Sequence, residues 1–453
     1  MFGSICDDAA TMGRLFGTDG VRGVANKDLT PDLALALGRA AGYVLAPDGG
    51  EVVIGRDTRV SGQMLESALV AGLCSAGATV RLAGVIPTPG VAYLTVEEDA
   101  VAGAMISASH NPVDDNGIKF FSKLGTKIAE DLELRIEEAM TETPDDPPTG
   151  VQVGSAGVLV DATERYLAHL QSTLDGDLAG LKIVLDCAHG AAWDVGPKAF
   201  QTAGVEVIAI HDTPDGSRIN VNCGSTSMDE LAKRVVSEGA AMGLAFDGDA
   251  DRVLAIDERG DAVDGDRIIG MLGLGLHDRG ELHNDMVVAT VMSNLGFRRA
   301  LEAHGIEVVL APVGDKYVGA AMTESGAVLG GEQSGHVIFG RHATTGDGIL
   351  TGLQVASVVA RAGSELSKLA HFYEPFPQVL INVEVPQPER VDQATELWTE
   401  IESAEASLSS DGRVLVRASG TEPLVRVMVE AEDETTARTT AEKVAESVRK
   451  RLL

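Results

Sequence analysis

The chain has 453 residues, more than a single hydrophobic core usually supports, so we expect three or four domains of roughly 100 to 150 residues with a cleft between them. Its formal charge of −32, from 36 basic and 68 acidic residues, argues against a nucleic-acid partner, because phosphate backbones are bound by basic surfaces. Apolar residues make up 44% of the chain, and no apolar run approaches the roughly 20 residues of a membrane helix, so we expect no membrane association.

The cysteines indicate a reducing compartment. Cys6, Cys74, Cys187 and Cys223 lie far apart and form no CxxC pair, which fits neither a disulfide framework nor a zinc site. We therefore expect free thiols and a cytoplasmic protein. Residues 1–11 lack the basic start and apolar core of a secretory signal, so we interpret them as a disordered extension or as the result of a start codon placed before Met12.

Strand, turn, helix and strand follow one another three times along the chain. The copies run from Val52 to Leu82, from Ile183 to Ile208 and from Val287 to Val309, and a glycine closes the helix of each. This pattern predicts three related βαβ domains, each with a right-handed crossover.

The last eighty residues follow a different plan. A strand from Val379 to Val385, a helix near Val391 to Ala406, two strands around Ser419 and a final helix from about Glu434 predict a small α+β domain. Proline-containing stretches mark the most plausible borders. The predicted domains are 12–164, 165–264, 265–373 and 374–453.

Ser109 and His110 follow the apolar run Val101 to Ile106, where a strand end presents side chains to a ligand. A serine there can act as a nucleophile, although a capping serine explains this segment about as well. Lys119 lies a few residues on and is a candidate proton shuttle or phosphate ligand, because partial desolvation can lower the pKa of a lysine.

Asp247, Asp249 and Asp251 lie in a loop between two apolar strands. Their spacing of two predicts that all three carboxylates point the same way, as a Mg²⁺ site requires. Glu258 falls where an EF-hand has its last ligand, but Arg252 occupies the position that needs glycine, which argues against calcium binding. An acidic turn without a metal stays open as an alternative.

Two later loops carry polar groups between glycines or strands. Gly331 to His336 offers Glu, Ser and His side chains to sugar hydroxyls, although by composition alone it is merely a turn. Arg417 to Pro423, followed by Arg426, combines two guanidinium groups with hydroxyls and a flexible backbone, a standard means of binding a phosphate monoester. A plain hairpin turn remains the competing interpretation of the second loop.

Taken in order, six segments resemble the α-D-phosphohexomutase superfamily over essentially all of the chain from Met12. They are FGTDGVRG, GRDTRVSG, ISASHNP, DGDADR, GEQSGH and RASGTEPLVR. Within that superfamily, GEQSGH, RASGTEP, GVIPTPGVAYLT and PVGDKYV are most similar to the phosphoglucosamine mutase family. The fold that this resemblance implies is α/β, with three related mixed α/β domains and a smaller C-terminal α+β domain around a central cleft.

The resemblance also implies a role for each motif residue. Ser109, beside His110, would be the phosphoserine, and its phosphate would join Asp247, Asp249 and Asp251 around one Mg²⁺. Proton transfer would fall to Arg22, Lys119 and His336, and the sugar hydroxyls to Glu332 and Ser334. Arg252 and Lys316 would assist electrostatically. The phosphate already on the substrate would be held by Arg417, Ser419, Gly420, Thr421 and Arg426.

The implied reaction interconverts glucosamine 6-phosphate and glucosamine 1-phosphate through a 1,6-bisphosphate and feeds the synthesis of UDP-N-acetylglucosamine. No cofactor besides Mg²⁺ is implied, and pairing of two chains through the first domain is a further expectation. A glucose or mannose phosphate mutase is the nearest alternative, since the residues that read a 2-amino group are not identified. A Mg²⁺-dependent sugar phosphatase and a catalytically silent sugar-phosphate-binding relative are more distant alternatives.

Overall fold

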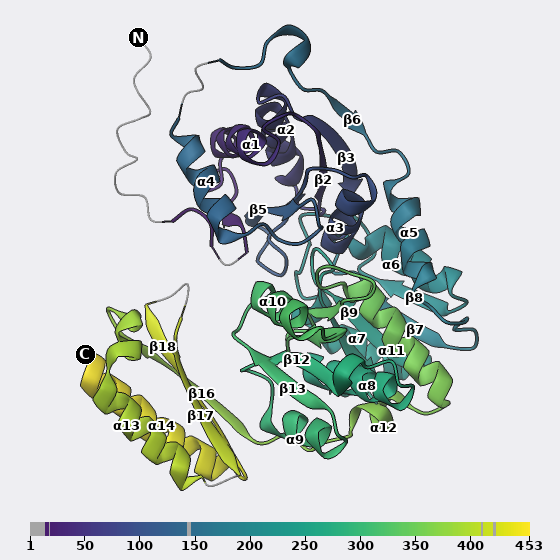
Figure 1. Cartoon of the computed structure of the whole chain (residues 1–453). Helices are drawn as coiled ribbons and strands as arrows, with labels where there is room; N and C mark the ends of the chain where they lie inside the picture. Colours follow the sequence, from purple (N-terminus) through teal and green to yellow (C-terminus); the bar gives the residue numbers. More distant parts are fainter. Residues whose placement is uncertain (1–13, 18, 143–145, 409–410, 420–422) are drawn as a thin grey trace. The chain divides into compact units, whose positions relative to one another are not determined.

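The computed structural model describes residues 14–17, 19–142, 146–408, 411–419 and 423–453 (Figure 1). The chain divides into two compact units: residues 1–291 with 306–370, and residues 292–305 with 371–453. Each unit is described separately below. Within the described residues, no helix combines the length and apolar character needed to cross a membrane.

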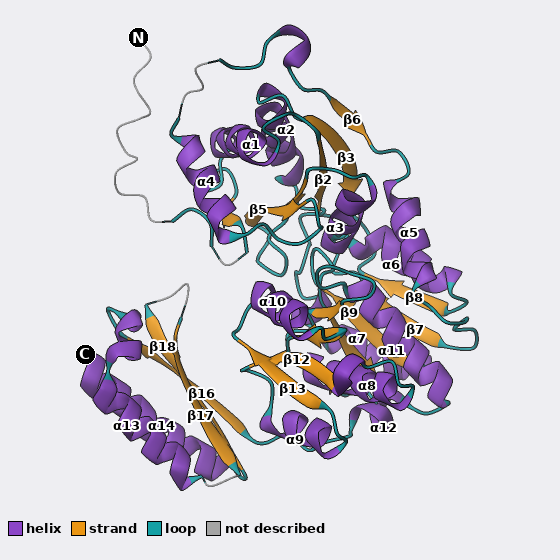
Figure 2. Ribbon diagram, viewed as in Figure 1, coloured by secondary structure: helices purple, strands orange, loops and turns teal. Residues whose placement is uncertain are grey.

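The first sheet of the larger unit has six strands in the order β1-β5-β4-β2-β3-β6. Strands β2, β3, β4 and β6 run parallel, whereas β5 is antiparallel to β4 and β1 is antiparallel to β5. Four helices surround this sheet (Figure 2). The strands are β1 (Val21–Val24), β2 (Glu51–Arg56), β3 (Thr79–Val85), β4 (Ala102–Ile106), β5 (Asp115–Ser122) and β6 (Ala156–Val158), and the helices are α1 (Pro31–Leu45), α2 (Gly62–Ser75), α3 (Thr88–Glu97) and α4 (Glu130–Met140).

The second sheet has the order β11-β10-β9-β7-β8, with β7, β8 and β9 parallel and β10 and β11 added antiparallel. The central strand β9 is buried along its whole length, and β7 and β10 are each buried except at one residue, as expected for strands covered by helices on both faces. The elements are α5 (Ala162–Ser172), β7 (Lys182–Asp186), α6 (Ala192–Thr202), β8 (Glu206–Ile210), a 3₁₀ turn η3 (Gly224–Thr226), α7 (Asp229–Glu238), β9 (Met242–Phe246), β10 (Val253–Asp257) and β11 (Ala262–Val263).

The third sheet has the order β13-β12-β14-β15, in which β12 is parallel to both neighbours and β15 is antiparallel to β14. The caps of two of its helices are aspartates that accept backbone N–H groups, Asp264 at α8 and Asp347 at α11. The elements of the larger unit that belong with the third sheet are α8 (Gly265–Asp278), η4 (His283–Asp285), β12 (Met286–Thr290), β13 (Glu307–Ala311), α10 (Asp315–Ser325), β14 (Leu329–Gly331), β15 (Val337–Phe339), α11 (Gly348–Ala362) and α12 (Leu366–Ala370).

The smaller unit contains an antiparallel three-stranded sheet in the order β16-β18-β17, whose apolar side chains form a core with its helices. Residues 292–305, which carry α9, belong to this unit because Asn294 and Leu295 hydrogen-bond to Phe376 and Glu430. The elements are α9 (Leu295–Ala303), β16 (Gln378–Glu384), η5 (Pro388–Gln393), α13 (Thr395–Ser407), β17 (Gly412–Ala418), β18 (Leu424–Ala431) and α14 (Glu434–Leu452).

The predicted elements agree with this architecture. Each predicted strand–helix–strand copy is present, as β2-α2-β3, β7-α6-β8 and β12-α9-β13, and each first strand pairs in parallel with the last. The last eighty residues form the predicted α+β arrangement. The helix predicted from Val391 begins later, at Thr395, because a 3₁₀ turn that starts at Pro388 precedes it. The predicted extension 1–11 lies outside the described residues.

Candidate active site

Ser109 lies in the turn that follows β4 and is buried. Its backbone has φ of 51°, a left-handed conformation that costs energy for a residue with a side chain. Its hydroxyl donates a 2.5 Å hydrogen bond to Asp247 Oδ2 and lies 3.2 Å from Nδ1 of the exposed His110. The predicted serine and the predicted metal loop therefore meet, although they are 138 residues apart.

Asp247, Asp249 and Asp251 converge as predicted, with carboxylate oxygens within 4.8 Å of one another. They lie in a loop between two strands, as predicted, but the expected reason for their convergence was wrong: the loop is a turn after β9 in which Ala250 has φ of 55°, so the alternation of an extended strand does not apply. Gly248 allows this turn to approach the serine, since a Cβ there would lie 2.5 Å from the Ser109 carbonyl oxygen. Chain reversal, not strand alternation, brings the carboxylates together.

The carboxylate cluster fits a divalent cation. Oδ1 of Asp249 and Oδ1 of Asp251 are buried without a hydrogen-bond partner among the described residues. Burial, together with the neighbouring Asp251 and Asp249, raises the pKa of Asp247 well above its ordinary value. A buried polar atom without a partner is costly, and a hard cation with oxygen ligands would remove both costs. The residues present therefore fit Mg²⁺.

Lys119, on β5, is buried and places its Nζ 2.8 Å from Asp249 Oδ2 and 3.5 Å from Asp251 Oδ2. Burial lowers its pKa, but the surrounding carboxylates of Asp19, Asp249 and Asp251 outweigh burial and raise the pKa above its ordinary value. The expectation of a lowered pKa is thus reversed in these surroundings. Lys119 therefore carries a positive charge here and is suited to neutralise an anion.

His336 is buried and faces the same cluster, with Nδ1 3.7 Å from Asp251 Oδ2. Its Nε2 accepts a 3.0 Å hydrogen bond from the Gly346 amide, which assigns the ring proton of the neutral form to Nδ1. Burial lowers the pKa of His336, while Asp251, Asp315 and Glu332 raise it above its ordinary value. The imidazole can therefore hold a proton that points toward the carboxylate cluster.

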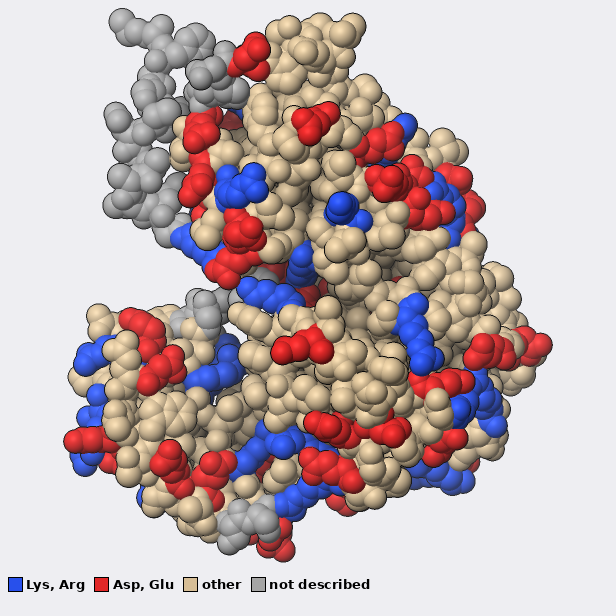
Figure 3. Space-filling view, in the orientation of Figure 1, with Lys and Arg blue, Asp and Glu red and all other residues tan. Residues whose placement is uncertain are grey.

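Arg22 reaches the serine turn from β1. Its guanidinium donates to the Ala108 carbonyl and to Asn111 Oδ1, each at 3.3 Å, and forms an ion pair with Asp19. The three side chains predicted for proton transfer thus converge on the turn or on the aspartates from three separate elements. On the face of the molecule shown in Figure 3, acidic and basic side chains are interspersed.

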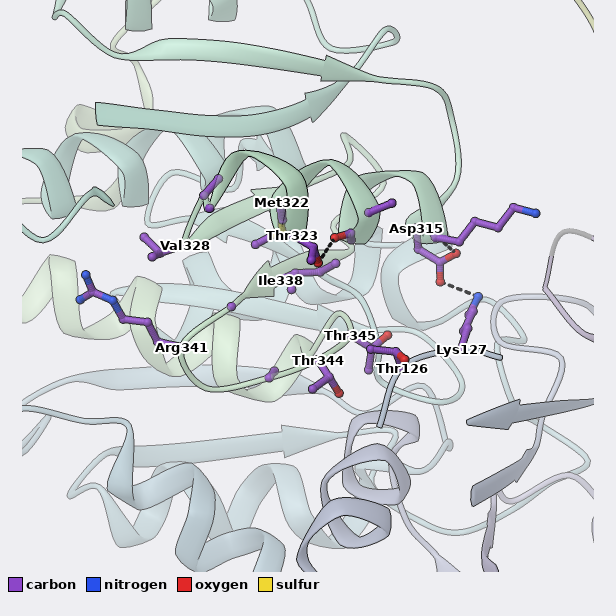
Figure 4. Close-up of a pocket in the computed structure, with 17 residues that line it drawn as sticks. Thr126, Lys127, Asp315, Met322, Thr323, Val328, Ile338, Arg341, Thr344 and Thr345 are labelled. Atoms are coloured by element: carbon purple, nitrogen blue, oxygen red, sulfur yellow. Dashed lines mark hydrogen bonds and ion pairs between the residues drawn. The ribbon is translucent and has the colours of Figure 1, made fainter. Parts of the chain in front are cut away.

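A cavity of about 530 Å³ opens beside Lys127 and Asp315 (Figure 4). Lys127 and Asp315 form an ion pair at its edge, Lys316 also lines it, and Met322 and Ile338 supply apolar walls. Ser109 and the three aspartates do not line it. The cavity therefore adjoins the chemical groups but does not contain them.

The predicted sugar loop links β14 to β15. The Ser334 hydroxyl has no hydrogen-bond partner among the described residues, and Glu332 accepts the Gly314 amide at 3.0 Å. Gly335 has φ of 89°, and a Cβ there would lie 2.3 Å from the Val253 carbonyl oxygen, so only glycine fits. Arg252 lies beside Asp251 at 3.8 Å. Gly335 therefore packs this loop against Val253 of β10, the strand that follows the three aspartates.

Arg417 and Arg426 lie directly opposite each other on β17 and β18. Like charges in this position are destabilising, and burial together with Arg426 lowers the pKa of Arg417. An anion between the guanidinium groups would relieve this repulsion. Ser419 directly follows β17, while Gly420 and Thr421 lie outside the described residues.

Sequence reasoning missed the residues that hold the serine turn. Arg59 is fully buried, pairs with Asp57 at 3.0 Å, and donates to the backbone carbonyls of Pro112, Ser109 (3.0 Å), Asn111 (2.8 Å) and Asp115 (2.8 Å). The motif GRDTRVSG contains both Asp57 and Arg59, but only the three-dimensional structure shows what they contact.

Two further contacts complete this support. Ser107 Oγ donates to Asp57 Oδ2 at 2.6 Å and accepts the Ser109 amide at 2.9 Å. Asn220 Nδ2, from the second sheet's domain, donates to the carbonyls of Ser109 at 2.8 Å and Asn111 at 3.2 Å. These polar groups fix the serine turn from both sides, and no local motif indicates Asn220.

Comparisons with known proteins agree with these observations. The phosphoglucomutase/phosphomannomutase alpha/beta/alpha domains I, II and III match residues 13–146, 164–260 and 264–376, and the C-terminal domain matches 380–447. The phosphoglucosamine mutases of Salinispora tropica and Streptomyces avermitilis are 52% and 54% identical over 97% of this chain and over 99% and 100% of their own lengths.

Solved structures agree with the sequence matches. A phosphoglucomutase/phosphomannomutase family protein from Burkholderia thailandensis superimposes with a TM-score of 0.83 at 25% identity and covers 97% of both chains. The N-acetylphosphoglucosamine mutase of Aspergillus fumigatus, solved with GlcNAc-6P and magnesium, shares the fold with a TM-score of 0.70 at 19% identity, covering 97% of this chain and 96% of its own. With four matching domains in order, the chain belongs to the phosphoglucomutase/phosphomannomutase family.

Proposed function

We propose that this protein is a phosphoglucosamine mutase, which interconverts glucosamine 6-phosphate and glucosamine 1-phosphate. The observation that carries the proposal is the contact of the Ser109 hydroxyl with Asp247, inside a buried cluster of three aspartates and Lys119. The choice of amino sugar rests on relatives of that name that are 52–54% identical over nearly the whole chain.

Ser109 carries the phosphoryl group, and Asp247, Asp249 and Asp251 hold Mg²⁺ together with it. When bound, the cation neutralises the charge that builds up on the transferred phosphoryl group. The two carboxylate oxygens without partners support this assignment.

The transfer breaks the bond between Ser109 Oγ and phosphorus and forms a bond from phosphorus to O1 of the sugar phosphate. The O1 proton leaves as that bond forms, and Ser109 Oγ regains a proton. Lys119, Arg22 and His336 surround this place and supply or accept these protons. Positioning and charge neutralisation account for most of the rate enhancement in such a transfer.

The product of the first step is glucosamine 1,6-bisphosphate, which reorients and returns its 6-phosphoryl group to Ser109. Glu332 and Ser334 orient the sugar hydroxyls, and Arg252 and Lys316 add positive charge. The hairpin residues Arg417, Ser419, Gly420, Thr421 and Arg426 bind the phosphate that is not being transferred; the opposed Arg417 and Arg426 support this role. The predicted domain borders, 12–164, 165–264, 265–373 and 374–453, are retained as part of this proposal.

The proposed setting is the cytoplasm, where the product feeds UDP-N-acetylglucosamine synthesis, and pairing of two chains remains a prediction. The alternative within the family is a glucose or mannose phosphate mutase.

The deciding experiment compares kcat/KM for glucosamine 6-phosphate, glucose 6-phosphate and mannose 6-phosphate, with Mg²⁺ and the matching 1,6-bisphosphate. A preference of tenfold or more for the amino sugar, about 1.4 kcal/mol, supports the proposal, and the reverse preference rejects the substrate.

Replacement of Ser109 by alanine tests the chemistry separately from the substrate. We expect Ser109→Ala to abolish mutase turnover and to carry no acid-stable phosphate, whereas we expect wild-type protein to carry one; mass spectrometry of both proteins checks this. Turnover at the wild-type rate in this variant would reject the phosphoserine route. Release of inorganic phosphate from glucosamine 6-phosphate by the wild-type protein, without isomerisation, would instead identify a phosphatase.

A further inference from the structure

A second cluster of metal-ligating side chains lies in the second sheet's domain, away from the three aspartates. Asp186 ends β7, His211 directly follows β8, and Cys223 directly precedes the turn η3. Because β7 and β8 are parallel and pair Asp186 with Ile210, their carboxyl ends bring Asp186 and His211 to the same edge. One ligand atom from each of the three residues lies within 4.8 Å of the other two.

The carboxylate of Asp186 is fixed by backbone groups. Oδ1 accepts the Ala188 amide and Oδ2 accepts the Gly224 amide, both at 2.9 Å. Each oxygen can still offer a second lone pair. His211 Nδ1 lies 3.1 Å from Asp186 Oδ1, so the imidazole and the carboxylate form an ion pair when the ring is protonated. Two potential ligand atoms therefore lie next to each other at this edge of the sheet.

The other ring nitrogen of His211 faces a carboxylate, since Nε2 lies 3.4 Å from Glu230 Oε2. Metal-binding histidines usually donate their second ring nitrogen to such a group, which fixes the ring and its tautomer. His189 shows the same pattern: its Nδ1 lies 3.1 Å from the Thr213 carbonyl oxygen, and its buried Nε2 has no partner among the described residues. The rings of His189 and His211 are 5.2 Å apart. An unpartnered, buried imidazole nitrogen thus adjoins the three-residue group.

Cys223 is fully buried, and its thiol donates a long hydrogen bond of 3.9 Å to the Arg218 carbonyl. Burial, with a smaller effect of Asp186, raises the pKa of this thiol to about 12. In the absence of a cation it is therefore protonated. A bound metal would displace that proton, and the thiolate and Asp186 together would balance a divalent charge.

We propose that Asp186, His211 and Cys223 form a binding site for a transition-metal ion of the zinc class, distinct from the Mg²⁺ site of the reaction. Thiolate and imidazole ligands favour such an ion over Mg²⁺ or Ca²⁺, which prefer oxygen. Tetrahedral zinc bonds place neighbouring ligand atoms roughly 3.3–3.7 Å apart, so a separation of 4.8 Å would have to shorten by about 1.1–1.5 Å. Binding forms a sulfur–metal bond and releases the Cys223 proton to solvent.

A metal bound at this site would stabilise the position of the serine turn. Asn220, three residues before Cys223, donates to the carbonyls of Ser109 and Asn111. The amide that follows Cys223, that of Gly224, is bound by Asp186. A metal that ties Cys223 to Asp186 and His211 would therefore restrict the segment that carries Asn220. The role is structural: the metal takes no part in phosphoryl transfer.

Cobalt(II) provides the test, because a cobalt–thiolate bond gives a charge-transfer absorption in the near ultraviolet that oxygen ligands do not give. The full-length protein is stripped with a chelator, kept reduced with a phosphine and titrated with Co²⁺ in excess Mg²⁺, which occupies the carboxylate site. We expect one equivalent of thiolate-bound Co²⁺, displaced by Zn²⁺, and a higher thermal unfolding temperature with Zn²⁺ present.

The variants are Cys223→Ser and His211→Gln, with Cys74→Ser as the matched control, since Cys74 is a free thiol outside the cluster. We expect the absorption band to be lost in Cys223→Ser, the Co²⁺ affinity to fall at least tenfold in His211→Gln, and both to be unchanged in Cys74→Ser. Circular dichroism checks folding, and His211→Gln alone decides if Cys223→Ser does not fold. The absence of a band in the wild-type protein, or its persistence in Cys223→Ser, overturns the proposal.

Discussion

Replacement of Arg59 by lysine tests whether the buried support of the serine turn sets the reaction rate. Arg59 makes five charge-assisted hydrogen bonds, one to Asp57 and four to backbone carbonyls of the turn. Lysine has three donors on one nitrogen, so at least two acceptors lose their partner. Each charged hydrogen bond contributes roughly 1.5–3 kcal/mol, so the loss of two lowers the free energy of unfolding by about 3–6 kcal/mol if the surrounding structure does not relax.

We expect Arg59→Lys to lower the unfolding temperature and to lower kcat by about a hundredfold, because a displacement of the nucleophile by about 1 Å costs that much. KM for the sugar phosphate should change little, since Arg59 contacts none of the proposed sugar-binding or phosphate-binding side chains. The assays are steady-state kinetics, thermal unfolding and the fraction of phosphorylated Ser109 by mass spectrometry.

Arg56→Lys is the matched control. Arg56 lies in the same motif and pairs with Glu66 at 3.3 Å, but it donates to no carbonyl of the serine turn. We expect its kcat to stay within threefold of the wild-type value. Equal kcat values for Arg59→Lys and Arg56→Lys, both close to wild type, would refute the assigned role of Arg59.

Three further predictions follow from burial and charge. Asp249→Asn removes one carboxylate charge and should raise the Mg²⁺ concentration for half-maximal activity at least about tenfold, measured by Mg²⁺ titration; an unchanged midpoint contradicts the proposed metal site. Arg417→Met should raise KM for the sugar phosphate while stabilising the free protein by about 0.2–1 kcal/mol, because the opposed Arg426 loses its repulsion; a fall in both stability and affinity would contradict this. Burial raises the pKa of Asp347 to about 6 from an ordinary 3.8, so its protonated form is favoured in the fold and about 3 kcal/mol of stability is lost as pH rises from about 4 through 6. Asp347→Asn can still form hydrogen bonds with Leu350 and Tyr166. Its unfolding temperature relative to that of the wild-type protein should therefore increase as the pH rises through 6, and a difference between the two proteins that does not change with pH would refute the argument.

Local sequence determined most of the elements and the residue types of the site. Val52 to Leu82 and its two counterparts predict strand–helix–strand copies because buried strands read as apolar runs and glycine ends helices, and these signals depend only on near neighbours along the chain. The loops at Ser109 and Asp247 were found in the same way, since short polar motifs after apolar strands lie at sheet edges, where ligands bind.

Tertiary structure alone decided which of these loops meet and what holds them. The hydrogen bond from Ser109 to Asp247 joins residues 138 apart, and Arg59 reaches carbonyls about 50 residues away, so no local pattern encodes either contact. Lys119 illustrates the same limit for charge: burial by itself lowers its pKa, but three carboxylates brought in by the fold raise it. The widely spaced Asp186, His211 and Cys223 show no metal-binding pattern along the chain, yet two parallel strands and the loop before η3 bring their ligand atoms within 4.8 Å. Periodicity and propensity act between near neighbours in the sequence, whereas ligand sets and pKa values depend on distances that only packing of the whole chain fixes.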